Sequence, residues 1–344
     1  MKILLVDDSY LIRSILKEII SSVEGFQVAG EAGNGQKAIE MAKELEPDLI
    51  LMDVNMPVMD GIEATGRIME IAPVPIVILT SEDISEVGYK ALNNGALELI
   101  PKPSVDKMNA PGFIENFKSV LENISKYGKF RIQKGRKPRG EMAKSAETKP
   151  ERIEKRTSTF SVLAIGASTG GPAAVRTLLS GLPGDFPLPI IISQHIEEGF
   201  DAGYASWLNS GTELTVRLAK ETDTLQAGTA LVAPATRHLL CQGARIYCDD
   251  SPRYNNQKPS VDKMFTSVAK KYGKEGLAVL LTGMGQDGAE GCVEIVTAGG
   301  TTLVQDEESS LIYGMPKAAA ERNGASRILP LDKMASTIKE LCRL

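Results

Sequence analysis

Short apolar runs alternate with amphipathic stretches along the first 125 residues of the chain. Runs of this length are typical of strands buried on both faces of a parallel sheet. Between them, apolar residues recur at helical spacing, for example over residues 10–23. Short strands that alternate with helices predict a doubly wound parallel sheet. The predicted strands are residues 3–6, 27–31, 48–52, 76–80 and 98–100, and further helices are predicted at 35–45 and 110–125.

A second α/β pattern begins at Phe160 and continues to the end of the sequence. It predicts another doubly wound, Rossmann-like parallel sheet, because fully apolar runs such as residues 277–281 again alternate with helical stretches. Residues 229–247 predict a β-hairpin inserted into this sheet. The other predicted strands are 162–165, 189–193 and 301–305, and the predicted helices are 172–179, 201–208, one after Ser260, 288–297, 315–322 and 331–342.

A chain of 344 residues is long enough for two domains, and the pattern breaks between them at residues 126–158. This segment has twelve Lys or Arg residues, four Glu and few large apolar side chains. Such a composition does not bury a core, so we predict a flexible basic linker. No aromatic platform accompanies the charge, and nucleic-acid binding is therefore not expected. The predicted organisation is a domain at 1–125, the linker at 126–158 and a domain at 159–344.

The remaining bulk properties argue against several classes of protein. The net charge of -5 gives no reason to expect a nucleic-acid partner. The four cysteines form no C-x-x-C pair, and with two histidines in the chain a zinc site is not expected. The first residues lack the pattern of a signal peptide. No apolar run approaches the roughly 20 residues of a membrane span, so we expect a cytoplasmic protein without membrane insertion.

Residues suited to metal and phosphate binding follow the strands of the first domain. Asp7 and Asp8 end the first predicted strand, Asp53 the third and Thr80 the fourth, and Lys102 follows the fifth. The carboxyl ends of parallel strands share one edge of the sheet, which is where such folds bind ligands. Three carboxylates at one edge need a cation, and their oxygen atoms suit Mg²⁺. A lysine and a threonine can bind an added phosphoryl group, so we predict phosphorylation of a carboxylate.

This constellation resembles the receiver domain of two-component response regulators, which has a flavodoxin-like fold. The resemblance is carried by Asp7-Asp8, the segment DVNMPVMDG at 53–61, Thr80-Ser81 and Lys102-Pro103. It implies that Asp53 is the phosphoacceptor. The implied Mg²⁺ ligands are Asp7, Asp8, Asp53 and the backbone carbonyl of Asn55, and the implied phosphate contacts are Thr80 and Lys102. Leu99 stands where the family usually has an aromatic switch residue, which argues against an aromatic-rotamer switch here.

The second domain has a serine in a glycine-rich turn. Gly166-Ala167-Ser168-Thr169-Gly170 follows a predicted strand and precedes a predicted helix, as in the nucleophile-elbow pattern. A helix N-terminus offers free backbone N–H groups and a partial positive charge. The N–H of Thr169 is then a natural donor to an oxyanion. By itself the motif is weak evidence, because phosphate-binding and structural turns share it.

A histidine and an aspartate follow two other strands of this domain. His195 comes after the strand at 189–193, and if that strand neighbours the first one, the imidazole lies roughly 5 Å from the serine turn. Asp287 lies in a glycine-rich loop after the strand at 277–281. We predict a triad of Ser168, His195 and Asp287, since triads are defined by geometry and not by chain order. The other histidine, His238, lies in the predicted hairpin and is not expected in the site.

Residues from about 160 onwards resemble the catalytic domain of the chemotaxis methylesterases. The shared motifs are IGASTGGP at 165–172, Gln194-His195, PSVD at 259–262, TGMGQDG at 282–288, QDEESS at 305–310 and GMP at 314–316. The resemblance implies hydrolysis of glutamate γ-methyl esters on chemoreceptors, with release of methanol, and deamidation of particular receptor glutamines. It implies Ser168 as nucleophile, His195 as general base and acid, and Asp287 as the orienting carboxylate. Thr169 and Met284 would line the oxyanion pocket.

The same resemblance implies how the activity is controlled. The unphosphorylated receiver domain covers the esterase site, and a chemotaxis histidine kinase opens it by phosphorylating Asp53. Chemoreceptors and this kinase are the implied partners. Mg²⁺ is the implied cofactor of the receiver domain, and none is implied for the esterase site. We expect a monomer.

Two other functions stay open at this level. Gly166, Gly170 and Gly171 follow a strand and could cradle a pyrophosphate, as in a nucleotide-dependent oxidoreductase. That fold usually has an acidic residue after the next strand, where this chain has Gln194-His195. The other candidate is a non-enzymatic response regulator whose output domain binds DNA or protein. The sequence after residue 160 has no helix-turn-helix pattern, so it gives this second candidate no support.

Overall fold

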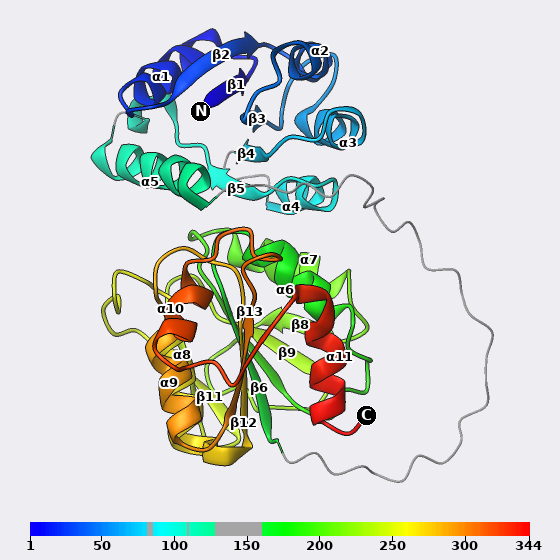
Figure 1. Cartoon of the computed structure of the whole chain (residues 1–344), viewed down its shortest axis with the longest axis vertical. Helices are drawn as coiled ribbons and strands as arrows, with labels where there is room; N and C mark the ends of the chain where they lie inside the picture. The colour runs from blue at the N-terminus through cyan, green and yellow to red at the C-terminus, as the bar shows by residue number, and fades with distance from the viewer. Residues whose placement is uncertain (81–84, 109, 128–159) are drawn as a thin grey trace, which may run out of the picture. The chain divides into compact units, whose positions relative to one another are not determined.

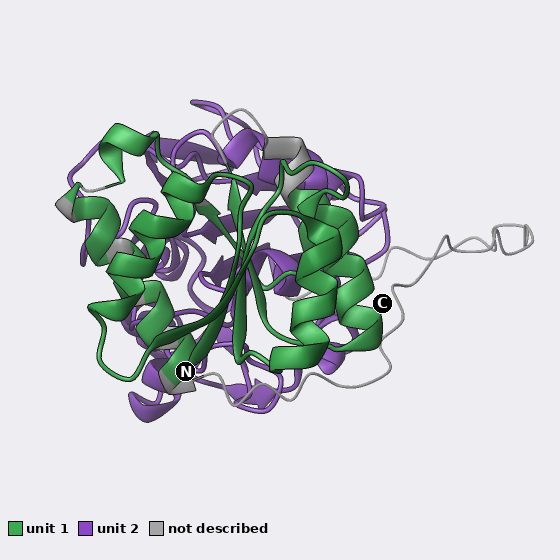
Figure 2. Ribbon diagram, turned by 90° about the horizontal axis from the view of Figure 1, so that it is seen from above, with its two compact units in different colours: residues 1–134 green, residues 135–344 purple. Residues whose placement is uncertain are grey.

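The computed structural model describes residues 1–80, 85–108, 110–127 and 160–344 (Figure 1). The chain divides into two compact units, Met1–Lys134 and Gly135–Leu344 (Figure 2). The division falls within the predicted linker at 126–158, most of which lies outside the described residues, and the domain limits stay a prediction. Across the described ranges, no helix combines the length and the apolar character that a bilayer-spanning segment needs.

The first unit is built on a five-stranded parallel sheet with the order β2-β1-β3-β4-β5. This is the flavodoxin-like order, and the predicted fold class is confirmed for this unit. The strands are β1 (Lys2–Val6), β2 (Gln27–Ala32), β3 (Leu49–Asp53), β4 (Ile76–Thr80) and β5 (Glu98–Pro101). The helices are α1 (Tyr10–Ser21), α2 (Gly35–Leu45), α3 (Gly61–Ile71), α4 (Ser85–Asn93) and α5 (Pro111–Tyr127), with a 3₁₀ turn, η2 (Val105–Lys107).

Two helices of this unit, α3 and α4, have no counterpart in the sequence prediction. Gly61 and Gly66 lower the helix propensity of the α3 segment. Asp60 nevertheless caps the helix by accepting a hydrogen bond from the N–H of Glu63 at 2.8 Å. Glycine is required at position 61, because a Cβ there would collide with the carbonyl oxygen of Asp53. The start of α3 is therefore held directly against the end of β3.

The second unit is built on a seven-stranded parallel sheet with the order β14-β13-β12-β6-β7-β9-β8. The chain enters in the middle at β6, builds one side of the sheet, and then returns to build the other side from β12. The order therefore reverses beside β6, where the carboxyl ends of the strands form a crevice in folds of this kind. The predicted Rossmann-like class is confirmed for this unit.

The elements of the second unit are as follows. Its parallel strands are β6 (Val162–Ala167), β7 (Ile190–Gln194), β8 (Thr215–Leu218), β9 (Thr229–Val232), β12 (Gly276–Leu280), β13 (Thr301–Gln305) and β14 (Arg327–Leu329). Its helices are α6 (Gly171–Leu179), α7 (Asp201–Asn209), α8 (Val261–Tyr272), α9 (Ala289–Thr297), α10 (Met315–Glu321) and α11 (Leu331–Leu341), with a 3₁₀ turn, η3 (Gly273–Glu275).

The predicted hairpin at 229–247 is wrong in its first half. Strand β9 pairs in parallel with β7 and β8 and belongs to the main sheet. The hairpin consists of β10 (His238–Gln242) and β11 (Arg245–Asp249), a separate antiparallel pair. A short apolar run shows that a strand is buried but not which strand it pairs with. The edge strands β8 and β14 were missed because exposed residues interrupt their short apolar pattern.

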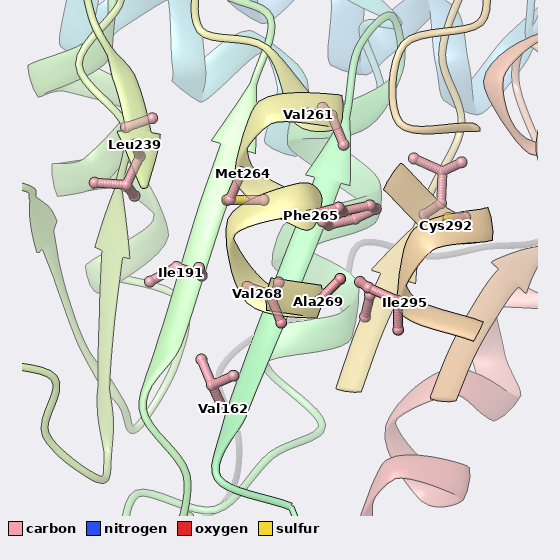
Figure 3. Packing of buried hydrophobic residues seen from close by; sticks show 14 of the residues in the cluster. Val162, Ile191, Leu239, Val261, Met264, Phe265, Val268, Ala269, Cys292 and Ile295 are labelled. Atoms are coloured by element: carbon pink, nitrogen blue, oxygen red, sulfur yellow. The ribbon is translucent and has the colours of Figure 1, made fainter. Parts of the chain in front are cut away.

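Helix α8 packs across the central strands of the second unit (Figure 3). Phe265 is fully buried in a hydrophobic cluster that includes Val162 of β6. Near the other end of β6, a Cβ on Gly166 would collide with Val261, the first residue of α8. The apolar face of the helix thus fixes its N-terminus close to the carboxyl end of β6.

Replacing Phe265 by alanine should destabilise the second unit by about 3–5 kcal/mol, because it leaves a cavity in a close-packed core. Trp207 is the only tryptophan of the chain, so its fluorescence during urea unfolding of the full chain reports on this unit. Ile328→Ala is the control, since Ile328 is 49% exposed on β14. That change should cost less than about 0.5 kcal/mol. An unchanged midpoint for Phe265→Ala would show that α8 does not anchor this core.

Candidate active site

Ser168 lies in the turn between β6 and α6, at the carboxyl end of the sheet. In this turn Gly170 has a φ of +74°, a left-handed conformation that glycine adopts without strain. The backbone N–H of Ser168 donates to the carbonyl oxygen of Thr282, just beyond the neighbouring strand β12, at 3.1 Å. The serine side chain is therefore presented from a turn that is fixed to the adjacent strand.

The imidazole of His195 bridges Ser168 and Asp287. Its Nδ1 lies 3.1 Å from the hydroxyl oxygen of Ser168, and its Nε2 lies 2.7 Å from a carboxylate oxygen of Asp287. The three residues follow β6, β7 and β12, which are adjacent in the order β12-β6-β7. The structure therefore brings the predicted serine, histidine and aspartate together at one edge of one sheet. Their catalytic roles stay a prediction.

The carboxylate of Asp287 is buried against the N-terminus of α8. The backbone N–H groups of Val261 and Asp262 donate to it at 2.7 and 2.9 Å. Ser260, the N-cap of the helix, donates its hydroxyl at 2.9 Å. Free N–H groups and the positive end of the helix dipole favour an anion at this position. The sequence predicted a capped helix after Ser260 but not this contact, because no local spacing relates the cap to Asp287.

These contacts set the charge state of Asp287. Burial disfavours its ionised form, but the hydrogen bond and charge of His195, with the N–H groups of α8, outweigh burial and hold the pKa of Asp287 below its ordinary value. The ionised carboxylate accepts the Nε2–H of His195, which leaves Nδ1 as an acceptor for the Ser168 hydroxyl. The imidazole thus presents its basic nitrogen to the serine.

A second buried carboxyl group, that of Asp262, lies beside Asp287. The Oδ1 atom of Asp262 accepts a hydrogen bond from the N–H of Gly291 at 2.8 Å, and the residue is 2% exposed. Burial and the charge of Asp287 raise the pKa of Asp262 to about 7. Because two adjacent carboxyl groups do not ionise together readily, Asp287 carries the charge and Asp262 is the last of the pair to ionise.

The residues predicted to line the oxyanion pocket, Thr169 and Met284, lie on two turns that meet at Ser168. The carbonyl oxygen of Thr169 accepts a hydrogen bond from the hydroxyl of Thr282 at 3.1 Å. Gly283 lies so close that a Cβ on it would be 2.7 Å from the Cβ of Ser168. Thr169 directly follows the serine, and Met284 directly follows the glycine that packs against it. Their role as oxyanion donors stays a prediction.

His238 serves the site only through its neighbours. It is fully buried in β10, and its Nδ1 accepts the backbone N–H of Ser260 at 3.0 Å. Its Nε2 lies 3.1 Å from the carbonyl oxygen of Pro252 and donates to it. Burial lowers the pKa of His238, so its neutral form is favoured. This histidine helps to hold the N-terminus of α8 and lies outside the row formed by Ser168, His195 and Asp287.

The first unit gathers the residues of the predicted phosphorylation site at the carboxyl end of its own sheet. Carboxylate oxygens of Asp7, Asp8 and Asp53 lie within 4.8 Å of one another. The Nζ atom of Lys102 lies 2.7 Å from Asp7 and 2.9 Å from Asp53. Thr80 is buried at the end of β4, and its carbonyl oxygen accepts the N–H of Lys102 at 2.6 Å. Residues from four separate segments of the sequence thus share one small site.

The charges of this cluster fit a divalent cation. Burial and the charge of Asp7 raise the pKa of Asp53, against the opposing effect of Lys102. Burial alone would lower the pKa of Lys102, but Asp7 and Asp53 outweigh it and raise that pKa. One lysine cannot neutralise three carboxylates. Their oxygen atoms are the kind of donors that Mg²⁺ prefers. The part of the Asn55 carbonyl in this site stays a prediction.

Comparison with known proteins finds a matching family model for each of the two units. A family model described as CheB methylesterase matches residues 163–338. A model described as response regulator receiver domain matches residues 3–110. A protein-glutamate methylesterase/protein-glutamine glutaminase of Anaeromyxobacter dehalogenans is 40% identical over 99% of this chain and 97% of its own length. The chain belongs to the CheB methylesterase family.

Other members of the family extend the similarity. A protein-glutamate methylesterase/protein-glutamine glutaminase of Pseudomonas fluorescens is 40% identical over 99% of both chains. The crystal structure of the CheB methylesterase catalytic domain of Thermotoga maritima is 35% identical, with a TM-score of 0.51. The match covers 53% of this chain and 98% of the Thermotoga maritima chain. The α/β fold of the second unit is therefore shared with a solved family member.

Neither alternative function gains support. The family model that matches residues 163–338 of the second unit is that of the CheB methylesterases, which is not a DNA-binding output domain. A dinucleotide-binding fold usually has an acidic residue after the strand that follows its glycine-rich turn. Here Gln194 and His195 occupy that place, and both side chains are hydrogen-bonded to Ser168.

Replacing Asp287 by asparagine should destabilise the second unit at neutral pH by about 2–3 kcal/mol, because charge-assisted hydrogen bonds are lost. The folded pKa of Asp287 lies below the ordinary value of 3.8. The stability contributed by its ionised form is therefore complete above that value and is lost as the pH falls through the folded pKa. The difference from wild type in urea unfolding, followed by Trp207 fluorescence, should be largest at neutral pH and should shrink below the ordinary carboxyl pKa.

Asp185→Asn is the matched control for this measurement, because Asp185 is an exposed aspartate of the same unit. It should change the unfolding free energy by less than about 0.5 kcal/mol. A loss of stability in Asp287→Asn that stays constant from acid to neutral pH would contradict the assignment of the buried charge to Asp287.

Proposed function

We propose that this chain hydrolyses the γ-methyl esters of glutamate residues in chemoreceptors and deamidates particular receptor glutamines. The similar full-length proteins carry the name protein-glutamate methylesterase/protein-glutamine glutaminase. The observation that carries the proposal is the hydrogen-bonded row of Ser168, His195 and Asp287 at the ends of three adjacent strands. Acyl transfer to a serine requires a base in this position and a carboxylate that orients the base.

In the first half-reaction Ser168 is the nucleophile. Its Oγ attacks the ester carbonyl carbon while Nδ1 of His195 takes the hydroxyl proton. The carbonyl oxygen becomes an oxyanion, to which the N–H groups of Thr169 and Met284 donate hydrogen bonds. His195 then gives the proton to the departing methoxy oxygen, the C–O bond breaks, and methanol leaves. The glutamyl side chain remains as an ester on Ser168.

In the second half-reaction water replaces methanol. Nδ1 of His195 takes a proton from water, and the resulting hydroxide attacks the acyl carbon. The bond to the Oγ of Ser168 breaks, and Oγ recovers the proton from His195. The product is a glutamate side chain. With a glutamine substrate the same steps release ammonia, and Asp287 stays ionised throughout to stabilise the imidazolium.

We further propose that phosphorylation of Asp53 by a chemotaxis histidine kinase activates the esterase. The receiver family match at residues 3–110 supports this assignment. When bound, Mg²⁺ would neutralise negative charge between the carboxylates and the incoming phosphoryl group. The residues that would hold the metal are Asp7, Asp8, Asp53 and, through its carbonyl, Asn55. Thr80 and Lys102 would contact the phosphoryl group, and Lys102 already pairs with Asp53 at 2.9 Å.

In this proposal the unphosphorylated receiver unit blocks the esterase site. A receptor helix is a large substrate that needs an open groove, and a neighbouring domain can cover such a groove. Phosphorylation need shift the balance between covered and open forms by only a few kcal/mol to change the rate tenfold or more. The protein would act as a cytoplasmic monomer on receptor segments, without nucleic acid and without inserting into the membrane.

Replacing Ser168 by alanine should lower methanol release from methylated receptor by at least about 10³-fold, because the acyl-enzyme cannot form. Ser193→Ala is the matched control, since Ser193 is a buried serine on the adjacent strand β7. Both variants should keep the cooperative urea unfolding of the wild type, which shows that they fold. Residual turnover near the wild-type rate in Ser168→Ala would exclude this serine as the nucleophile.

Replacing Asp53 by asparagine should abolish the stimulation of methanol release by a small phosphodonor and Mg²⁺. Asp48→Asn is the control, because Asp48 immediately precedes the same strand, β3, at its opposite end. It should keep the wild-type stimulation. Equal stimulation of the Asp53→Asn protein would place the regulatory phosphorylation elsewhere.

A further inference from the structure

The side chain of Gln194 links the two turns that carry the serine and the histidine. Gln194 ends β7 and is 2% exposed. Its Nε2 donates to the carbonyl oxygen of Ser168 at 2.8 Å and to the carbonyl oxygen of His195 at 3.0 Å. The carbonyl oxygen of Ser168 also accepts the N–H of Gly171 at 2.7 Å. Two donors from inside the unit therefore fix the direction of this carbonyl group.

The direction of the Ser168 carbonyl decides where the next N–H group points. In a trans peptide the C=O and N–H bonds of one peptide unit point in opposite directions. The only cis peptide among the described residues is Lys258–Pro259, so the peptide between Ser168 and Thr169 is trans. With the carbonyl held by buried Gln194, the N–H of Thr169 must point away from the interior of the unit.

The other proposed oxyanion donor is oriented in the same way but by backbone groups alone. The carbonyl oxygen of Gly283 accepts the N–H of Met315 at 2.9 Å and the N–H of Gly314 at 3.2 Å. These contacts aim the N–H of Met284 away from the start of α10. At the Ser168 peptide, by contrast, one of the two contacts comes from a side chain, so it can be removed by substitution.

Stability alone does not explain a glutamine at position 194. Its Oε1 is buried and has no hydrogen-bond partner among the residues that the structure describes. A buried unsatisfied acceptor costs about 1–3 kcal/mol, which an apolar side chain of the same length would avoid. This oxygen packs directly against Gly171, where even a Cβ would collide with it. The contribution of Gln194 therefore lies in what its two donated hydrogen bonds hold in place.

We propose that Gln194 is a positioning residue for the esterase reaction, which locks the Ser168–Thr169 peptide so that the N–H of Thr169 faces the oxyanion. The inference rests on the proposed function of this site. Without the Nε2 donor, the carbonyl of Ser168 keeps a single hydrogen bond, from Gly171, and the peptide plane can tilt. Since the oxyanion exists only near the transition state, the loss should appear in kcat and not in substrate binding.

The test compares wild type with Gln194→Met, which keeps the length of the side chain and removes its donors. With methylated receptor, kcat for methanol release should fall about 10- to 100-fold, while KM changes by less than about twofold. The affinity for an alkylboronic acid should fall by the same factor as kcat, because its tetrahedral adduct with Ser168 places an oxygen in the oxyanion position. Ser193→Ala, one residue earlier in the same strand, should leave all three values unchanged.

Several outcomes would overturn the inference. They are an unchanged kcat in folded Gln194→Met, a rise in KM alone, or an unchanged affinity for the boronic acid. If Gln194→Met does not fold, Gln194→Glu replaces it, because the neutral acid donates one hydrogen bond and the carboxylate donates none. Its kcat, relative to wild type at each pH, should be lower at alkaline than at acidic pH, and an equal ratio would count against the inference.

The proposed esterase function can be disproved independently of the role of Gln194. It is disproved if the wild-type protein releases methanol from methylated receptor no faster than Ser168→Ala. The boronic acid measurement does not use the receptor, so it still decides the role of Gln194 in that case.

Discussion

The buried carboxylate of Asp287 at the N-terminus of α8 is the interaction on which the esterase site depends. Three donors from the start of this helix and one from His195 converge on its two oxygen atoms. They keep the charge on Asp287 although it is buried, and the charge in turn fixes which nitrogen of the imidazole carries the proton. The apolar packing of α8 is therefore connected to the tautomer of His195 through one carboxylate.

The remaining contacts make the esterase site rigid. Thr282 joins three segments: its carbonyl accepts the N–H of Ser168, and its hydroxyl donates to Thr169 and accepts from Ile312. Gln305 holds the N–H of Thr282 at 2.7 Å. Groups fixed before the substrate arrives need not reorganise during the reaction, which is how a preorganised oxyanion pocket lowers a barrier.

The sequence predicted those features that local pattern and strand order determine. Both parallel sheets followed from the alternation of short apolar runs with helices, and Ser168, His195 and Asp287 meet because each follows a strand of the same sheet. The pairing of β9 with β7 could not be predicted from the apolar run of β9, since a buried strand can pair with any other strand of the sheet. The contacts of Ser260 and Gln194 were also missed, because they depend on side-chain and backbone directions that only the folded chain defines.

The central claim is that Asp287 determines which ring nitrogen of His195 carries the proton, and nitrogen NMR measures this directly. The chain has two histidines, so the spectrum is simple to assign. In wild-type protein with ¹⁵N-labelled histidine at neutral pH, we predict that Nε2 of His195 carries the proton and that Nδ1 has the shift of an unprotonated nitrogen. In Asp287→Asn this preference should weaken or reverse, while the signals of His238 keep their tautomer. A proton on Nδ1 of His195 in the wild type would contradict the account, because the nitrogen that faces Ser168 could not then act as its base.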